Sequence, residues 1–76
     1  MFVMACCNEG NIMIQKFGSF EDAKAALVKE YIAACDWCGI EDPWDEEHSR
    51  IGILADHTEA WVDWYDGRFD AKVQEL

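Results

Sequence analysis

Four cysteines are the residues of this chain whose type and spacing best suit chemistry. Cys35 and Cys38 are separated by two residues, and Cys6 and Cys7 are adjacent. A Cys-x-x-Cys pair serves either as a redox dithiol or as one half of a zinc site. A redox pair needs a thiolate stabilised at a helix N-terminus, but Cys35 and Cys38 fall at the C-terminal end of a helical pattern, where the helix dipole and Asp36 disfavour negative charge. We therefore expect buried thiols rather than a redox site.

A zinc site formed by all four cysteines is the second possibility for these residues. Neighbouring residues of a strand point to opposite faces, so Cys6 and Cys7 cannot both reach one metal without distortion. We predict no metal ligand and no cofactor, and a small zinc-binding module remains an alternative.

The other polar residues do not form a recognisable catalytic set. His48 and His57 have no serine or cysteine at a spacing that would make a nucleophile and base pair. The carboxylates of residues 41–47 lack the spacing of a calcium loop, and the chain has no glycine-rich phosphate loop. A chain of 76 residues also needs most of its apolar side chains for a stable core, which leaves few to line a catalytic cleft. We predict that the protein is not an enzyme and has no catalytic residue.

The N-terminal half is predicted to be a hairpin followed by a helix. Apolar runs at residues 2–7 and 11–17 flank Asn8-Glu9-Gly10, which favours a hairpin with a short loop. Ser19 is a suitable N-cap with Asp22 three residues later, and Gly39 is a suitable residue to end the helix. Asp42 is predicted to cap a single helical turn that begins at Pro43. The predicted buried stripe of the helix is Phe20, Ala23, Leu27, Tyr31, Ala34 and Cys38, widened by Val28, Ile32 and Cys35.

The C-terminal part is predicted to contain three strands. Asp66-Gly67 favours a two-residue type I′ hairpin, which pairs Tyr65 with Arg68, Trp64 with Phe69 and Asp63 with Asp70. An alternating pattern from Arg50 predicts a preceding strand, and a two-residue turn at His57-Thr58 would place Ile51 opposite Trp64. The fold class is therefore predicted to be α+β, with two layers in the order β-β-α-β-β-β. One helix packs on one face of an antiparallel sheet, and residues 1–76 form a single domain.

The other face of this sheet is predicted to be a binding surface. Trp37 and Trp64 are assigned to the core because small cores use large side chains, whereas Trp61 alternates with acids on the uncovered face. An exposed aromatic residue with a charged rim is a common arrangement of interface hot spots. The predicted partner-binding residues are Glu59, Trp61, Asp63, Tyr65, Asp70 and Asp56, together with Asp42, Asp45, Glu46 and Glu47 of the acidic loop.

The charge of the chain limits the class of partner. The formal net charge is −10, of which −9 falls in residues 36–76. Such a field repels nucleic acid and anionic membranes and attracts basic protein surfaces. The N-terminus lacks the features of a secretory signal and no apolar run is long enough to span a membrane, so we expect a cytoplasmic protein.

Three segments carry a resemblance to known proteins. They are Phe17–Leu27, which is followed by the acidic loop, the short run Ile51–Ala55, and the ending Trp64–Val73. Together they resemble small acidic proteins of phages and mobile elements, and in size and charge the chain is similar to anti-CRISPR proteins. The resemblance implies a non-enzymatic inhibitor in the host bacterial cytosol that meets a Lys/Arg-lined surface, such as the surfaces of a CRISPR-Cas effector that read a PAM or hold displaced DNA. The alternative is a self-associating structural or accessory protein of a phage or mobile element, in which the open face is buried in a homodimer.

Overall fold

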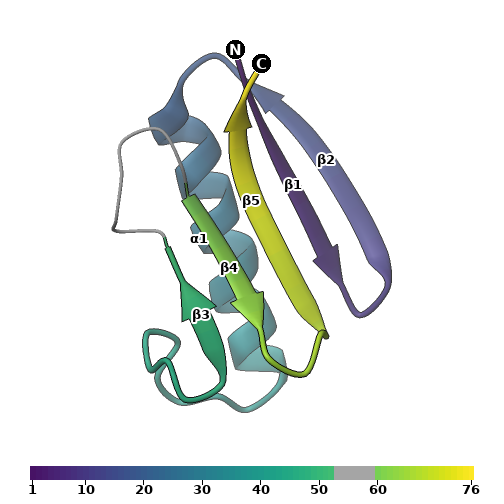
Figure 1. Cartoon of the computed structure of the whole chain (residues 1–76), viewed down its shortest axis with the longest axis vertical. Helices are drawn as coiled ribbons and strands as arrows, with labels where there is room; N and C mark the ends of the chain where they lie inside the picture. The colour runs from purple at the N-terminus through teal and green to yellow at the C-terminus, as the bar shows by residue number, and fades with distance from the viewer. Residues whose placement is uncertain (53–59) are drawn as a thin grey trace.

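The computed structural model describes residues 1–52 and 60–76, which form one five-stranded antiparallel sheet and one helix (Figure 1). The elements are β1 (Phe2–Asn8), β2 (Asn11–Phe17), α1 (Phe20–Trp37), β3 (Ser49–Ile51), β4 (Ala60–Trp64) and β5 (Phe69–Glu75). The predicted two-layer α+β fold is confirmed.

The first and last strands pair with each other at the centre of the sheet, whose strand order is β2-β1-β5-β4-β3. Met4 lies opposite Val73, and Cys6 lies opposite Ala71. This pairing joins the N-terminal hairpin to the C-terminal hairpin and places both chain ends at one end of the molecule (Figure 1). Burial alternates along β5 as a strand requires: Phe69, Ala71 and Val73 are buried, while the residues between them are exposed.

Both ends of α1 are capped as the sequence predicts. The Ser19 side chain accepts a hydrogen bond from the Asp22 backbone N–H at 3.2 Å. At the other end Gly39 has a φ of 75°, and the N–H groups of Gly39 and Ile40 donate to the carbonyls of Asp36 and Cys35. This pair of bonds is a Schellman motif, which satisfies carbonyls that the end of a helix would otherwise leave unpaired.

The helix covers one face of the sheet and supplies six of the core residues. Phe20, Ala23, Leu27, Tyr31, Ala34 and Cys35 are buried against the inward-facing residues of β1, β4 and β5. Cys38 and Val28 are half-buried, and Ile32 is exposed, so the stripe is narrower than predicted. Trp64 belongs to the core as predicted, but Trp37 does not, since it is 85% exposed. Trp37 lies six residues after Tyr31 and therefore falls about 120° around the helix from the buried face.

The β1–β2 hairpin has the short loop that the sequence predicts, whereas the β4–β5 loop differs from its prediction. The register predicted for β4 and β5 is confirmed, with Asp63 opposite Asp70. However, the paired residues end at Asp63 and Asp70, so the predicted pairs of Trp64 with Phe69 and of Tyr65 with Arg68 are not part of the register. Four residues connect the strands and Gly67 alone among them has a positive φ, so the predicted type I′ turn is wrong. The positive φ values at both central positions, which a type I′ turn requires, occur instead at Glu9 and Gly10 between β1 and β2.

The position of β3 also differs from its prediction. Ser49 lies opposite Trp64 and Ile51 lies opposite Val62, which is a shift of two residues from the predicted pairing of Ile51 with Trp64. A shift of two keeps each side chain on its face. Residues 53–59, which include the turn predicted at His57-Thr58, lie outside the described residues.

A buried hydroxyl fixes this register and attaches the connection between α1 and β3. The Tyr31 hydroxyl donates to the Pro43 carbonyl and lies 3.2 Å from His48 Nε2 and 3.3 Å from Ser49 Oγ. Ser49 is fully buried, so it needs this polar neighbour. Within the connection, Asp42 caps the segment at Pro43 as predicted, since its carboxylate accepts from the Trp44 N–H at 3.1 Å. The segment is a tight turn, closed by the Asp45 N–H on the Asp42 carbonyl, rather than the predicted helical turn.

We predict that Tyr31→Phe destabilises the protein by about 1–3 kcal/mol, because it removes the polar partner of buried Ser49 and of the Pro43 carbonyl. Denaturant unfolding measures this change. Tyr65→Phe is the matched control, since Tyr65 is 63% exposed and should lose less than about 0.5 kcal/mol. Equal effects of the two substitutions would contradict the structural role of the Tyr31 hydroxyl.

Candidate binding surfaces

The uncovered face of the sheet does not present Trp61 as a free aromatic side chain. Trp61 is half-buried and packs over Gly52, whose backbone N–H donates to the Trp61 carbonyl at 2.8 Å. A Cβ added at Gly52 would lie 2.2 Å from the indole ring, so only glycine allows this contact. The Arg50 guanidinium lies 6.0 Å from the centre of the ring. Trp61 is therefore held by its own sheet.

The paired aspartates of this face are also partly neutralised. Asp63 and Asp70 face each other as predicted, but Arg50 stands on the other side of Asp63 and donates to its carboxylate at 2.5 Å. Lys72 follows Asp70 on the same face of β5. Among the described residues, the open face therefore carries acids and bases in similar number, and the predicted grid of acids is not its main feature.

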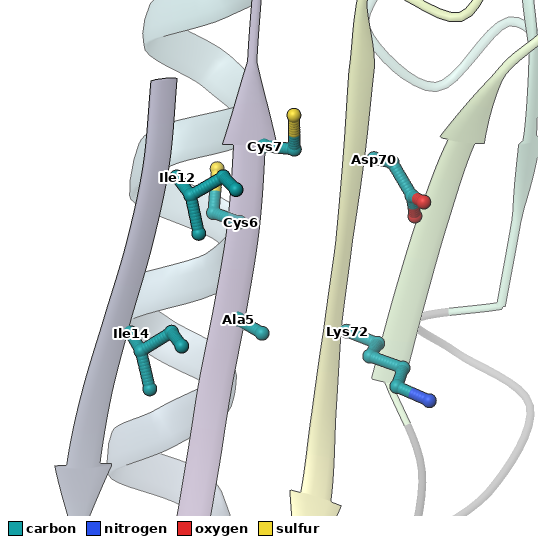
Figure 2. Close-up of a pocket in the computed structure, with 7 residues that line it drawn as sticks. All are labelled: Ala5, Cys6, Cys7, Ile12, Ile14, Asp70 and Lys72. Carbon is teal, nitrogen blue, oxygen red and sulfur yellow. The ribbon is translucent and has the colours of Figure 1, made fainter. Parts of the chain in front are cut away.

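The β1–β2 side of the open face is apolar. Ile12 and Ile14 of the edge strand β2 are 76% and 65% exposed. They flank an open depression whose floor is the small side chain of Ala5, with Cys7 above it and Asp70 and Lys72 on its far side (Figure 2). Sequence reasoning missed this patch, although Ile12 and Ile14 have the two-residue spacing that puts both on one face.

The acids of the chain gather at one end of the molecule instead. We define the acidic end as residues 36–48 and 65–68, which comprise the last turn of α1, the connection to β3 and the β4–β5 loop, at the lower end of Figure 1. Arg68 is the one basic residue in these segments, against seven acids. The C-terminus of α1 points here with no basic residue in its last turn, so its dipole adds to the negative field. The seven acids are Asp36, Glu41, Asp42, Asp45, Glu46, Glu47 and Asp66.

Exposed aromatic side chains occur at the same end. Trp37 is 85% exposed, Tyr65 is 63% exposed and Trp44 is 44% exposed, and these are the exposed aromatic residues of the described part of the chain. Trp44 is fixed on one side by its contact with Tyr31, whose ring centre is 5.5 Å away. The acidic end thus combines negative charge with aromatic surface.

Arg68 attaches the β4–β5 loop to the rest of the acidic end. Its Nε donates to Asp66 at 2.7 Å, its guanidinium lies 5.3 Å from the Trp64 ring centre, and Nη1 lies 3.6 Å from Cys38 Sγ. The Arg68 backbone N–H also donates to Asp66, and this bond, together with the guanidinium, holds the pKa of the Asp66 carboxyl below its usual range. The single arginine here is thus engaged within the fold.

The predicted partner-binding residues are divided between these places. Asp42, Asp45, Glu46, Glu47 and Tyr65 belong to the acidic end, whereas Trp61, Asp63 and Asp70 lie on the open face. Asp56 and Glu59 lie outside the described residues. Trp37 is the residue of the acidic end that sequence reasoning misplaced.

The cysteines are free thiols that do not converge on one point. Cys6 faces the core and Cys7 faces the open side of the sheet, as strand alternation requires. Burial raises the pKa of Cys6 to about 11 and also raises the pKa of Cys35, which opposes thiolate chemistry at both. In residues 1–52 and 60–76, no three His, Cys, Asp or Glu side chains are grouped to hold a metal ion. In the same residues, α1 lacks a stretch apolar and long enough to cross a membrane.

We predict that Gly52→Ala destabilises the wild-type protein by about 1 kcal/mol or more, because its methyl group displaces the Trp61 ring. In a Trp61→Ala background the same substitution should cost much less. A double-mutant cycle by denaturant unfolding measures the difference. Additive effects would show that the two residues are not in contact.

Comparison with known proteins adds no assignment: the chain has no significant match to a protein-family model, a curated protein or a solved structure.

Proposed function

We propose that this chain is a non-enzymatic binding protein whose acidic end occupies the basic surface of a partner protein. The observation that carries the proposal is the coincidence of seven carboxylates and three exposed aromatic side chains, Trp37, Trp44 and Tyr65, at one end of the fold. Aromatic residues supply most of the binding energy at protein interfaces, and complementary charge steers the encounter.

The partner class is a protein whose Lys/Arg-lined groove binds nucleic acid. Such a groove is built to accept closely spaced phosphates, at roughly one negative charge per 3.4 Å along each DNA strand. A dense group of carboxylates can occupy it by charge alone, without chemistry of its own. The likeness of the chain to anti-CRISPR proteins makes a CRISPR-Cas effector in the bacterial cytosol the first candidate, with the chain as a phage-encoded inhibitor.

The acidic end suits this role because hydrogen bonds of the Tyr31 hydroxyl, the Schellman motif and the Asp42 carboxylate maintain its shape. The Tyr31 hydroxyl and the Schellman motif fix the connection between α1 and β3 without using the side chains of Glu46 or Glu47, both of which are exposed. These carboxylates are therefore available to a partner without loss of structure.

We predict that Glu46→Lys combined with Glu47→Lys leaves stability unchanged within about 0.5 kcal/mol but weakens partner binding at least about tenfold. The measurement is inhibition of PAM-duplex binding by purified CRISPR effectors, followed by fluorescence anisotropy at two salt concentrations. The control is Glu21→Lys combined with Glu75→Lys, which makes the same change in net charge away from the acidic end and should preserve inhibition.

A third variant, Trp37→Ala, separates aromatic contact from charge, and we expect it to weaken inhibition without destabilising the fold, since Trp37 is 85% exposed. Equal loss of inhibition in the Glu46/Glu47 variant and its control would show that net charge, rather than the acidic end, is responsible. Absence of inhibition by the wild-type chain across a panel of effectors would reject this partner class.

A further inference from the structure

The open face of the sheet is a second surface, separate from the acidic end, and its pattern is fixed by the strand registers. The registers align its outward side chains in two adjacent rows that cross the sheet from β2 to β3. One row is Ile12, Cys7, Asp70, Asp63 and Arg50, and the next is Ile14, Ala5, Lys72, Trp61 and Gly52.

We propose that a second copy of this chain binds this face, with a twofold axis that runs across the strands between the two rows. Such an axis exchanges the rows while it keeps each strand over its counterpart. Ile12 then meets Ile14 of the second copy, Cys7 meets Ala5, and Asp70 meets Lys72. Each of these three contacts occurs twice in the dimer, and each pairs apolar with apolar or acid with base. The same axis places Asp63 over Trp61 and Arg50 over Gly52.

Charge complementarity selects this arrangement among the symmetric ones. An axis that runs along the row of Asp70 would place Asp70 against Asp70 of the second copy. An axis parallel to the strands would place the apolar strand β2 over β3, which carries Arg50. Only the axis between the rows matches both the isoleucines and the Asp70–Lys72 pair.

The same axis reduces repulsion between two chains that each carry a charge of −10. Because it reverses the strand direction, the two acidic ends lie at opposite ends of the dimer. The molecule is 16 Å deep and has two layers, one helix and one sheet, which Figure 1 shows face-on. The dimer therefore has the sheets inside, packed face to face, and the helices outside.

The upper limit on the size of the face is comparable to one side of a standard protein interface. The molecule measures 33 by 25 Å across this view. The face therefore offers at most roughly 800 Å², which is about the area that each partner contributes to a standard protein interface. The exposed Ile12 and Ile14 lie at the side of the open depression drawn in Figure 2, so that the apolar patch of each copy meets that of the other.

Charge reversal with rescue tests the proposal. Sedimentation equilibrium measures the dimer dissociation constant of the wild type, of Asp70→Lys, of Lys72→Asp and of the double variant that carries both substitutions. Each single substitution opposes like charges and should raise the dissociation constant at least about tenfold, whereas the double variant restores both pairs and should return to within about threefold of the wild type. Both positions are exposed strand sites, and circular dichroism checks that each variant is folded.

A second measurement reports on the face directly. Cys7 lies on the open face and Cys38 at the end of α1, and both are half-buried. Alkylation of Cys7 should slow as the protein concentration rises, while alkylation of Cys38 stays constant. A wild-type chain that remains monomeric at millimolar concentration, or a double variant as weak as the single ones, would overturn the proposal.

Discussion

The pairing of β1 with β5 is the constraint on which the rest of the structure depends. It joins the two ends of the chain and brings Met4 and Cys6 from one end beside Val73 and Ala71 from the other within one core. It also determines which residues of the two hairpins lie side by side on each face of the sheet. Once Cys7 is opposite Asp70, every outward residue from Ile12 to Arg50 is placed by the β1–β2, β4–β5 and β3–β4 registers.

The distribution of charge follows from this topology. Strands and helix alternate in direction, so the β1–β2 loop, the α1–β3 connection and the β4–β5 loop all emerge at the same end (Figure 1). The acids are concentrated in two of these three segments, the α1–β3 connection and the β4–β5 loop. The fold therefore brings these two segments together in the acidic end. The open face, which is made of strand residues alone, keeps a balance of acids and bases among the described residues.

Local signals in the sequence predicted local structure well. Ser19, Asp22 and Gly39 predicted the ends of the helix, and a turn centred on Asp66-Gly67 predicted the β4–β5 register even though the turn type was wrong. The β3 register was wrong because it depends on a buried polar contact between Ser49 and Tyr31, which are far apart in the sequence. Trp37 was misplaced because side-chain size was given more weight than helical phase.

The binding residues were harder to predict because exposure is decided by neighbours on other strands. Trp61 and Asp63 alternate correctly for the open face, yet Gly52 and Arg50 of the next strand cover the ring and pair with the carboxylate. Nothing within residues 61–63 indicates this. The exposure of the acidic loop was easier to predict, since a run of carboxylates around a proline is rarely buried.

The way in which the acidic end is held determines how salt should act on this protein. Seven carboxylates repel one another, and a fold that relied on ion pairs to fix them would weaken as salt screened those pairs. Here Tyr31, Ser49 and the Schellman motif hold the connection through neutral hydrogen bonds, and the carboxylates of Asp42 and Asp45 accept from backbone N–H groups of the same segment. The ion pair at this end is that of Arg68 with Asp66. Salt therefore relieves repulsion within the fold, whereas it would screen attraction to the basic partner that we propose, so stability and the proposed binding should respond to ionic strength in opposite directions.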